Sequence, residues 1–265
     1  MVAGEWATLS TIARREKLSV CMAAYNGSRY IHEQIASILL QMEASDELII
    51  VDDRSKDNTT DLVENFADRR VRLVRNDCNC GVARSFERAL ELVTGDIVFL
   101  SDQDDVWHSD KVRSILAAFH ANPDVTLVIS SVEMIDAAGD CIPQSVRQHR
   151  PFRGGVFQTL VKNHYRGCAM AFRRCVVEAT LPFPAGIPMH DSWIGLINAV
   201  VGKTQFLDIP LVRHRRHDQN ASGIRRLSVF QRSVDRWFLC TNLIWRARSL
   251  HERRARLKTR HGSVS

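Results

Sequence analysis

The sequence has no apolar run that approaches the roughly 20 residues a transmembrane helix requires. Residues 1–16 also lack the basic start and apolar core of a secretory signal peptide, and we expect them to form a loose leader. No internal repeat and no low-complexity segment is present. These absences argue against membrane-spanning, exported and repeat proteins and favour a cytoplasmic globular protein.

The cysteine pattern indicates neither a disulfide scaffold nor a zinc site. There are seven cysteines, an odd number, and several of them lie inside apolar runs. Cys78 and Cys80 have the wrong spacing for a zinc knuckle, and no second pair follows. We therefore expect reduced thiols, with the cysteines of the apolar runs acting as small hydrophobic residues.

Charge is unevenly distributed along the chain. Residues 213–265 contain 14 basic and 3 acidic residues, a net +11, and the total of +6 leaves −5 for residues 1–212. A basic tail of this kind can bind nucleic acid or an anionic membrane. No nucleic-acid recognition motif is present, so we expect no nucleic-acid partner.

Strand and helix patterns alternate through the first 105 residues. Apolar runs predict strands at 18–24, 47–51, 71–75 and 97–100, with helices between them. The alternation predicts an α/β fold with a parallel sheet covered on both faces. Such sheets bind ligands beyond the carboxyl ends of their strands, where this chain has Tyr25–Asn26, Asp52–Asp53 and Asp102–Asp104.

The second half of the sequence is less regular. Strands are expected at 125–131, 167–172 and 206–212, and helices at 111–120, 173–179, 192–201 and 227–250. Residues 136–155 are rich in turn-forming residues and predict a surface excursion. The expected organisation is a leader at 1–16, a domain at 17–223 with halves at 17–107 and 108–223, and a basic helical extension at 224–265.

Three acids follow the apolar run that ends at Leu100. Asp102 and Asp104 are alternate residues of an extended segment, so their carboxylates project to the same side. Adjacent carboxylates repel each other unless a cation or a donor-rich ligand lies between them, and a hard divalent ion bound to phosphate would fill that role. The competing interpretation is a solvated turn that opens the next helix.

Four ordered motifs resemble those of family 2 glycosyltransferases. They are Val20–Gly27 (VCMAAYNG), Ile49–Thr59 (IIVDDRSKDNT), Asn79–Gly81 (NCG) and Leu100–Trp107 (LSDQDDVW). The form of the last motif, together with Gly167–Phe172 (GCAMAF) and His190–Asp191, is most similar to the rhamnosyltransferase-like branch. The resemblance implies the GT-A fold, an α/β sandwich that binds nucleotide sugars on a mixed, mostly parallel sheet, here with an amphipathic C-terminal helix added.

The resemblance also implies roles for individual residues. Asp104 would bind a divalent metal, Mn²⁺ or Mg²⁺, on the donor diphosphate, and Asp105 could share this task. Asp191 matches the general base that takes the proton from the acceptor hydroxyl, which gives inversion; its competing interpretation is a helix N-cap, and both roles can coexist. The donor would be bound by Ala23, Tyr25, Asn26, Asp53, Asp102 and Gln103.

Three further residues each have two interpretations. His217 is either a third metal ligand or a surface histidine in a basic loop. Arg215 could clamp the diphosphate or be solvated. Arg84 could reach a phosphate, but an arginine on a helix surface is the favoured interpretation.

The sequence departs from the family pattern in two places. Ala23 stands where relatives often have Pro or Thr, and the Gln-x-x-Arg-Trp signature of processive members is missing, since Gln231–Trp237 has two extra residues. We expect an enzyme that transfers one sugar, rhamnose by resemblance, from a dTDP- or UDP-sugar to a glycan or lipid-linked glycan of the cell surface. The alternative is a catalytically silent scaffold protein that binds nucleotide sugars or glycans.

The long C-terminal helix combines aromatic residues with arginines at near-helical spacing. Such a helix can lie on an anionic membrane, which would suit a lipid-linked acceptor. It can equally pack against the body or against a second subunit of a homo-oligomer. The sequence leaves open both a homo-oligomer and peripheral contact with the cytoplasmic face of the membrane through residues 225–260.

Overall fold

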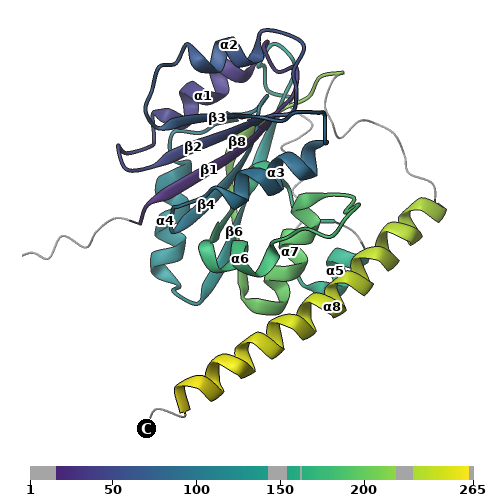
Figure 1. Cartoon of the computed structure of the whole chain (residues 1–265). Helices are drawn as coiled ribbons and strands as arrows, with labels where there is room; N and C mark the ends of the chain where they lie inside the picture. Colours follow the sequence, from purple (N-terminus) through teal and green to yellow (C-terminus); the bar gives the residue numbers. More distant parts are fainter. Residues whose placement is uncertain (1–15, 143–153, 162, 219–228, 263–265) are drawn as a thin grey trace, which may run out of the picture.

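The computed structural model describes residues 16–142, 154–161, 163–218 and 229–262, so nearly all of the expected leader and the start of the basic extension lie outside the described residues. The described chain forms one eight-stranded sheet with helices on both faces (Figure 1). The strands are β1 Leu18–Ala24, β2 Glu47–Asp52, β3 Val71–Arg75, β4 Ile97–Asp102, β5 Val106–Trp107, β6 Val125–Ile135, β7 Met170–Arg173 and β8 Lys203–Arg215. The helices are α1 Ile31–Leu39, α2 Thr59–Glu64, α3 Val82–Glu91, α4 Lys111–Ala121, α5 Val156–Val161, α6 Arg174–Thr180, α7 His190–Val201 and α8 Val229–Gly262.

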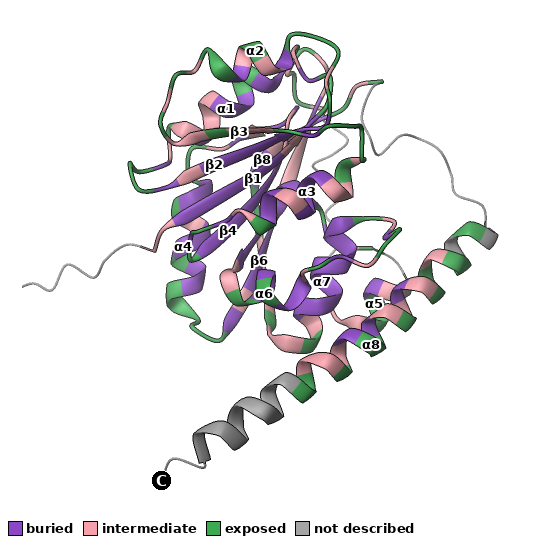
Figure 2. Cartoon of the chain, viewed as in Figure 1, coloured by how far each residue is buried: buried purple, intermediate pink, exposed green. Residues whose placement is uncertain are grey.

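The first four strands form a parallel block in the order β3-β2-β1-β4, as the alternation predicts. Side chains alternate across the sheet, so Val20 and Met22 of β1 join the core under α1, whereas Cys21 joins the core under α3. Ile31 and Ile35 of α1 fill the first core, and Phe86 of α3 fills the second. Strands β1, β2 and β4 are buried along most of their length (Figure 2), which explains why each appears in the sequence as a nearly continuous apolar run. The edge strand β3 is only partly buried, and its apolar residues are interspersed with arginines.

The second half of the chain completes a mixed sheet. β7 runs antiparallel between β4 and β6, β8 is parallel to β6, and β5 pairs antiparallel with the end of β8. The expected strand at 167–172 is corrected at its start, because Gly167–Ala169 forms a 3₁₀ turn before β7. β6 and β8 extend beyond their expected ends through register shifts near Ser131 and Pro210, and β5 and α5 had no clear pattern in the sequence.

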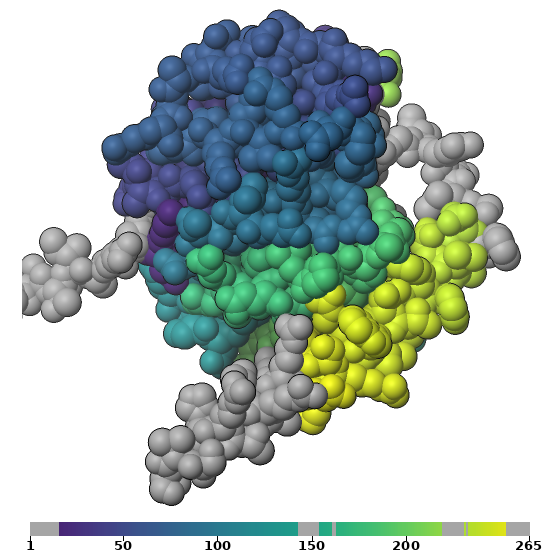
Figure 3. Space-filling model, viewed as in Figure 1, coloured from purple at the N-terminus to yellow at the C-terminus, as the bar shows by residue number. Residues whose placement is uncertain are grey.

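The long C-terminal helix α8 runs from Val229 to Gly262, so the helix expected over 227–250 continues through the Arg-rich end of the expected helical extension. It packs against α7 and α5 along one side of the molecule (Figures 1 and 3). None of the helices within the described ranges is both long and apolar enough to cross a bilayer.

All seven cysteines have free thiols. Cys21 and Cys168 are buried, as expected of small hydrophobic residues in apolar runs. Cys78, Cys80, Cys141 and Cys175 are exposed, so that interpretation does not extend to them.

Candidate active site

The polar loops that follow β1, β2 and β4 meet at one edge of the sheet. In the strand register, Ala23 of β1 lies beside Asp102 of β4, and Ala24 lies beside Asp52 of β2. The backbone N–H of Asp53 donates to the Ala24 carbonyl over 2.7 Å, which joins two of the loops directly. The expected convergence at the carboxyl ends of the strands is therefore present.

Asp102 shares its surroundings with three other potential metal ligands. One ligand atom each of Asp102, Asp105, Cys168 and His214, named here the acid cluster, lies within 4.8 Å of the others. Oδ1 of the fully buried Asp105 accepts hydrogen bonds from His214 Nδ1 at 2.9 Å and from the Arg215 N–H at 3.0 Å. Oδ2 of Asp105 is buried and has no partner within the described part of the chain. Such an oxygen is costly to bury unless a cation or water binds it.

Asp104 makes a different contact. Its Oδ2 lies 2.8 Å from Nε2 of His217, and the His217 ring packs against Tyr30 with ring centres 4.9 Å apart. The structure thus brings together the two residues that the sequence analysis assigned to the metal. The acid cluster is a second set of potential ligands. Its member Asp105 lies close enough for its charge to act on Asp104, so the cluster is next to this pair.

Burial and mutual repulsion make these acids hard to ionise. Desolvation, with the charges of Asp105 and Asp104, raises the pKa of Asp102 to about 8. Burial and the charge of Asp105 raise the pKa of Asp104, although the hydrogen bond from His217 opposes the shift. Burial alone would lower the pKa of His214, but the hydrogen bond and charge of Asp105 outweigh it and raise that pKa. Carboxyls in this condition release protons when a divalent cation binds.

A buried lysine lies behind the acid cluster. Lys111 Nζ donates to the Cys168 carbonyl over 2.7 Å and lies 3.9 Å from the centre of the Trp107 ring. Desolvation lowers the pKa of Lys111 to about 7, although the charges of Cys168, Asp105 and Asp102 oppose the shift. The ammonium group fixes the backbone position of Cys168 within the cluster.

Asp53 holds the loop that contains the Asn79–Gly81 motif. Its Oδ1 accepts from Asn76 Nδ2 and from the Cys80 N–H, both at 2.8 Å, and its Oδ2 accepts from the Gly81 N–H at 2.7 Å. A carboxylate has about four acceptor positions, so three protein donors leave room for one more. Asp53 therefore links the turn after β2 to the start of α3 and keeps capacity for a ligand N–H.

Gln103 and Asn26 fix the shape of the loop after β1. Gln103 Oε1 accepts from the Tyr25 N–H at 2.9 Å, and Gln103 Nε2 donates to the Tyr25 carbonyl at 3.0 Å. Asn26 Oδ1 accepts from the Lys56 N–H at 2.8 Å, which connects this loop to the turn after β2. A Cβ at Gly27 would collide with Oε1 of Gln103, so the close approach requires glycine. The Tyr25 side chain remains 41% exposed beside these fixed loops.

Asp191 lies in the first turn of α7, and the N-cap residue of that helix is Met189. The interpretation of Asp191 as the N-cap residue is therefore wrong. Oδ1 of Asp191 accepts hydrogen bonds from Asn163 Nδ2 at 3.0 Å and from the Ser192 N–H at 2.6 Å. Burial raises the pKa of Asp191 to about 6, and these hydrogen bonds limit the rise. A carboxylate with this pKa is well matched to accept a proton near neutral pH.

The start of β7 connects Asp191 with the acid cluster. A Cβ at Gly167 would lie 2.7 Å from His190 Nε2 and 3.8 Å from Asp191 Cβ, so Gly167 is in direct contact with the start of α7. The next residue, Cys168, belongs to the acid cluster. Asp191 and the acid cluster consequently flank one short segment, and the charge of Asp191 contributes to the raised pKa of Asp102.

The two arginine candidates are already engaged by protein groups. Arg215 is 2% exposed; it donates to the Asp104 carbonyl at 2.9 Å and forms an ion pair with Glu33 at 2.6 Å. The Arg215 side chain is therefore not solvated, and its contacts with Asp104 and Glu33 do not form an open clamp for a phosphate. Arg84 pairs with Glu87 on the same helix, in agreement with the favoured helix-surface interpretation.

Five contributors to the site were not named as site residues in the sequence analysis: Lys111, Asn163, Cys168, Glu33 and His214. They come from α4, from the segments before and within the 3₁₀ turn, from α1 and from the end of β8. Two of them had a usable signal: Cys168 lies within the Gly167–Phe172 motif, and His214 stands three residues before the candidate His217. The others are positioned by tertiary packing alone.

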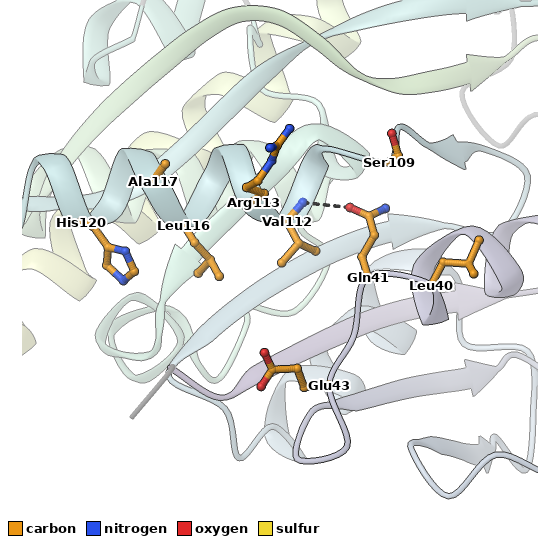
Figure 4. Close-up of a pocket in the computed structure, with 9 residues that line it drawn as sticks. All are labelled: Leu40, Gln41, Glu43, Ser109, Val112, Arg113, Leu116, Ala117 and His120. Carbon is orange, nitrogen blue, oxygen red and sulfur yellow. Dashed lines mark hydrogen bonds between the residues drawn. The ribbon is translucent and has the colours of Figure 1, made fainter. Parts of the chain in front are cut away.

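A separate open groove of about 540 Å³ lies between the end of α1 and the outer side of α4 (Figure 4). Gln41, which lines the groove, reaches from the end of α1 toward α4, where its Oε1 accepts from the Val112 N–H at 3.1 Å. The residues lining it are Leu40, Gln41, Glu43, Ser109, Val112, Arg113, Leu116, Ala117 and His120. Because this lining includes none of the candidate donor, metal or base residues, the groove is not part of the active site.

Comparison with known proteins agrees with this arrangement. Residues 19–181 match the family model described as Glycosyl transferase family 2. The chain belongs to this family. The family 2 match covers β1 to the end of α6, and thus the donor loops and the acid cluster except His214.

Named relatives extend the comparison beyond the family model. The UDP-Glc:alpha-D-GlcNAc-diphosphoundecaprenol beta-1,3-glucosyltransferase WfgD of Escherichia coli is 29% identical over 68% of this chain and 69% of its own length. The dTDP-rhamnosyl transferase RfbG of Shigella flexneri is 33% identical, over 36% of this chain and 35% of its own. A glycosyltransferase of Nostoc is 28% identical over 77% of this chain, and the match spans 66% of that protein.

Solved structures show that this family 2 member has the GT-A fold. TarS 1–349 of S. aureus, in complex with UDP-GlcNAc, superimposes with a TM-score of 0.66 at 16% identity, over 87% of this chain and 66% of that one. The mannosyltransferase PcManGT of Pyrobaculum calidifontis, in complex with GDP-Man and Mn²⁺, gives a TM-score of 0.60 at 23% identity, over 79% and 59%. The expected mixed, mostly parallel α/β architecture is therefore confirmed.

Proposed function

We propose that this protein is a glycosyltransferase that moves one sugar from a nucleoside-diphosphate donor to an acceptor hydroxyl, with inversion at the anomeric carbon. The observation that carries the proposal is the segment at the start of β7, where Gly167 contacts α7 at Asp191 and Cys168 joins the acid cluster. A carboxylate suited to take a proton thus lies beside acids suited to hold a diphosphate through a cation.

The donor nucleotide is proposed to bind across the ends of β1, β2 and β4, in the half formed by residues 17–107. The exposed ring of Tyr25 offers a stacking surface for a base, and Asp53 keeps acceptor capacity for a ring N–H. Ala23 and Asp102 lie side by side where the ribose and first phosphate would follow. Gln103 and Asn26 act here by fixing the loop backbone.

The turn after β4, which contains Asp102, Asp104 and Asp105, is suited to a divalent metal. A cation would bind the buried Oδ2 of Asp105 and relieve the repulsion that raises the pKa values of Asp102 and Asp104. We assign the principal ligands to Asp104 and His217, with Asp105 next to them, and an imidazole ligand favours Mn²⁺ over Mg²⁺. When bound, the metal supplies positive charge that stabilises the diphosphate leaving group.

The protein's own chemical contribution is a proton transfer. Asp191 takes the proton of the acceptor hydroxyl while its oxygen bonds to the anomeric carbon and the bond from that carbon to the diphosphate oxygen breaks. Asn163 and the Ser192 N–H hold one carboxylate oxygen in place during this step. General base catalysis of this kind contributes on the order of 10²–10⁴-fold in rate.

The experiment is to compare the wild type with Asp191→Asn, using donor binding and sugar transfer as separate readouts. We expect the variant to keep the donor Kd and to lose transfer by roughly 10²–10⁴-fold. Asp61→Asn, an exposed change on α2, is the matched control and should behave as the wild type. Normal turnover by Asp191→Asn would overturn the base assignment, and a wild type that binds donors without any turnover would indicate the silent scaffold instead.

The finer identity of the substrates is proposed from resemblance and from the relatives. The LSDQDDVW motif favours a rhamnose donor, and the names of WfgD and RfbG refer to UDP-Glc and dTDP-rhamnose, so we propose a UDP- or dTDP-hexose. The WfgD name also refers to a diphosphoundecaprenol acceptor, and we propose a lipid-linked glycan here. That acceptor would draw the protein to the cytoplasmic face of a membrane. Thermal-shift screening of nucleotide sugars with Mn²⁺ would identify the donor.

A further inference from the structure

Helix α8 has two different apolar faces. On the inner face, Leu239 and Leu243 are buried in the core shared with α7. Arg246 lies on the same side, 7% exposed, and donates to the carbonyls of Ala179 at 3.1 Å and Leu181 at 2.6 Å, and also to that of Pro182. These contacts attach the helix firmly to the body. Of the interpretations left open by the sequence, packing against the body therefore holds for the inner face.

The outer face carries large apolar side chains that the body does not cover. Val234 is 41% exposed, Trp237 70%, Ile244 49% and Trp245 67%. Successive helical residues are rotated by about 100°, which places all four on one side of the helix, opposite Leu239 and Leu243. A cluster with two exposed indoles is unusual on a surface that faces only water.

The charge on α8 is complementary to an anionic surface. Residues 229–262 contain nine basic and two acidic residues, a net +7. Arg248 is exposed, and the same rotation places it on the outer face. Indole rings favour the interface between lipid chains and headgroups, and an arginine there is attracted to anionic headgroups.

We infer that the outer face of α8, formed by Val234, Trp237, Ile244 and Trp245, docks in the plane of an anionic lipid bilayer. A second copy of this chain fits the same face poorly, because a symmetric contact would bring two helices of charge +7 together. The inference goes beyond the proposed function, since docking needs neither donor nor metal.

Docking through α8 would also orient the active site. The inner face of α8 packs against α7, the helix whose first turn contains Asp191. The base would therefore be held close to the bilayer surface, where the sugar-bearing head of a lipid-linked acceptor is found. Docking of α8 would thus favour the lipid-linked glycan acceptor proposed above.

The test measures binding of the full chain to vesicles of phosphatidylglycerol and phosphatidylcholine by flotation, with pure phosphatidylcholine vesicles as the neutral comparison. We expect binding to the anionic vesicles that weakens as salt rises. Trp237→Gln with Trp245→Gln should weaken it by at least about tenfold, because two indoles lose their interfacial burial. Both side chains are exposed, so the melting temperature should not change.

Leu40→Gln is the matched control, because it removes an apolar side chain that is 87% exposed at the end of α1. It should bind vesicles like the wild type, as should Asp191→Asn. The inference is overturned if the wild type does not float with anionic vesicles, if the control loses binding as the double variant does, or if sedimentation without lipid shows a dimer that the double variant abolishes. Vesicle binding without sugar transfer would instead count against the proposed function alone.

Discussion

Asn163 shows how a single exposed amide can control the candidate base. Its Oδ1 accepts from the Tyr165 N–H at 2.9 Å, which fixes the orientation of the amide and directs Nδ2 toward Asp191. A donor of this kind stabilises the charged carboxylate and opposes the increase in pKa caused by burial. The same carboxyl without Asn163 would remain protonated to a higher pH.

A pH profile tests this relation. Asp191 must be ionised to act as a base, so the transfer rate should fall as pH decreases through about 6. In Asn163→Ala the acidic limb should move to higher pH by about half a unit to one unit, because the charged form loses a hydrogen bond.

Ser192→Ala is the comparison for that profile. The Ser192 hydroxyl lies 3.4 Å from Oδ1 of Asp191, a long contact, and the shorter bond comes from its backbone N–H, which the substitution keeps. Its acidic limb should stay close to that of the wild type. An unchanged limb in Asn163→Ala would show that Asn163 does not set the pKa of Asp191.

At the scale of elements, the sequence predicted most of what depends on local pattern. The bounds of β1 and β3 agree with the predicted strands, and β2 and β4 extend beyond theirs by one and two residues, because buried parallel strands produce short apolar runs between turn-forming residues. The aspartates were predictable for the same reason, since they follow those runs directly. Contacts such as Lys111 with the Cys168 carbonyl and Asn163 with Asp191 were not predictable, because they join distant segments through packing that leaves no periodic signal.

The attachment of α8 combines the buried Leu239 and Leu243 with one charged side chain, that of Arg246. Replacing Arg246 by Ala should destabilise the fold by about 2–4 kcal/mol, because a buried side chain is truncated and three carbonyls, that of the buried Ala179 among them, lose a charged donor. Arg248→Ala, two residues away and exposed, should change stability by less than about 0.5 kcal/mol. Denaturant unfolding of both variants measures the difference, and equal stabilities would mean that Arg246 does not hold the helix.

At the scale of the whole molecule, proton binding at Asp102 links stability to cations. Its folded-state pKa of about 8 lies above the unfolded value of about 3.9, so this carboxyl keeps its proton in the folded chain and loses it on unfolding. Its contribution is therefore fully present below about pH 4 and is lost as pH rises to about 8. A divalent cation has to displace that proton, so it binds more tightly as pH rises.

Thermal unfolding with Mn²⁺ and with chelator tests this linkage. The increase in melting temperature due to Mn²⁺ should be larger at pH 8 than at pH 6. In Asp104→Asn the increase should be small at both values, because a principal ligand is lost. An equal increase at both pH values in the wild type would show that the metal does not compete for the proton of Asp102.

The antiparallel direction of β7 has a consequence for how this enzyme could diversify. A parallel strand would contribute its last residues to the edge where the donor loops meet, but β7 begins at that edge, so the residues that precede it, 163–168, lie there beside Asp191. Under the proposed function, substitutions in residues 163–168 would change the acceptor side of the site while the donor loops of β1, β2 and β4 keep their geometry. On that proposal, donor choice and acceptor choice depend on separate stretches of chain, and each could evolve without a matching change in the other.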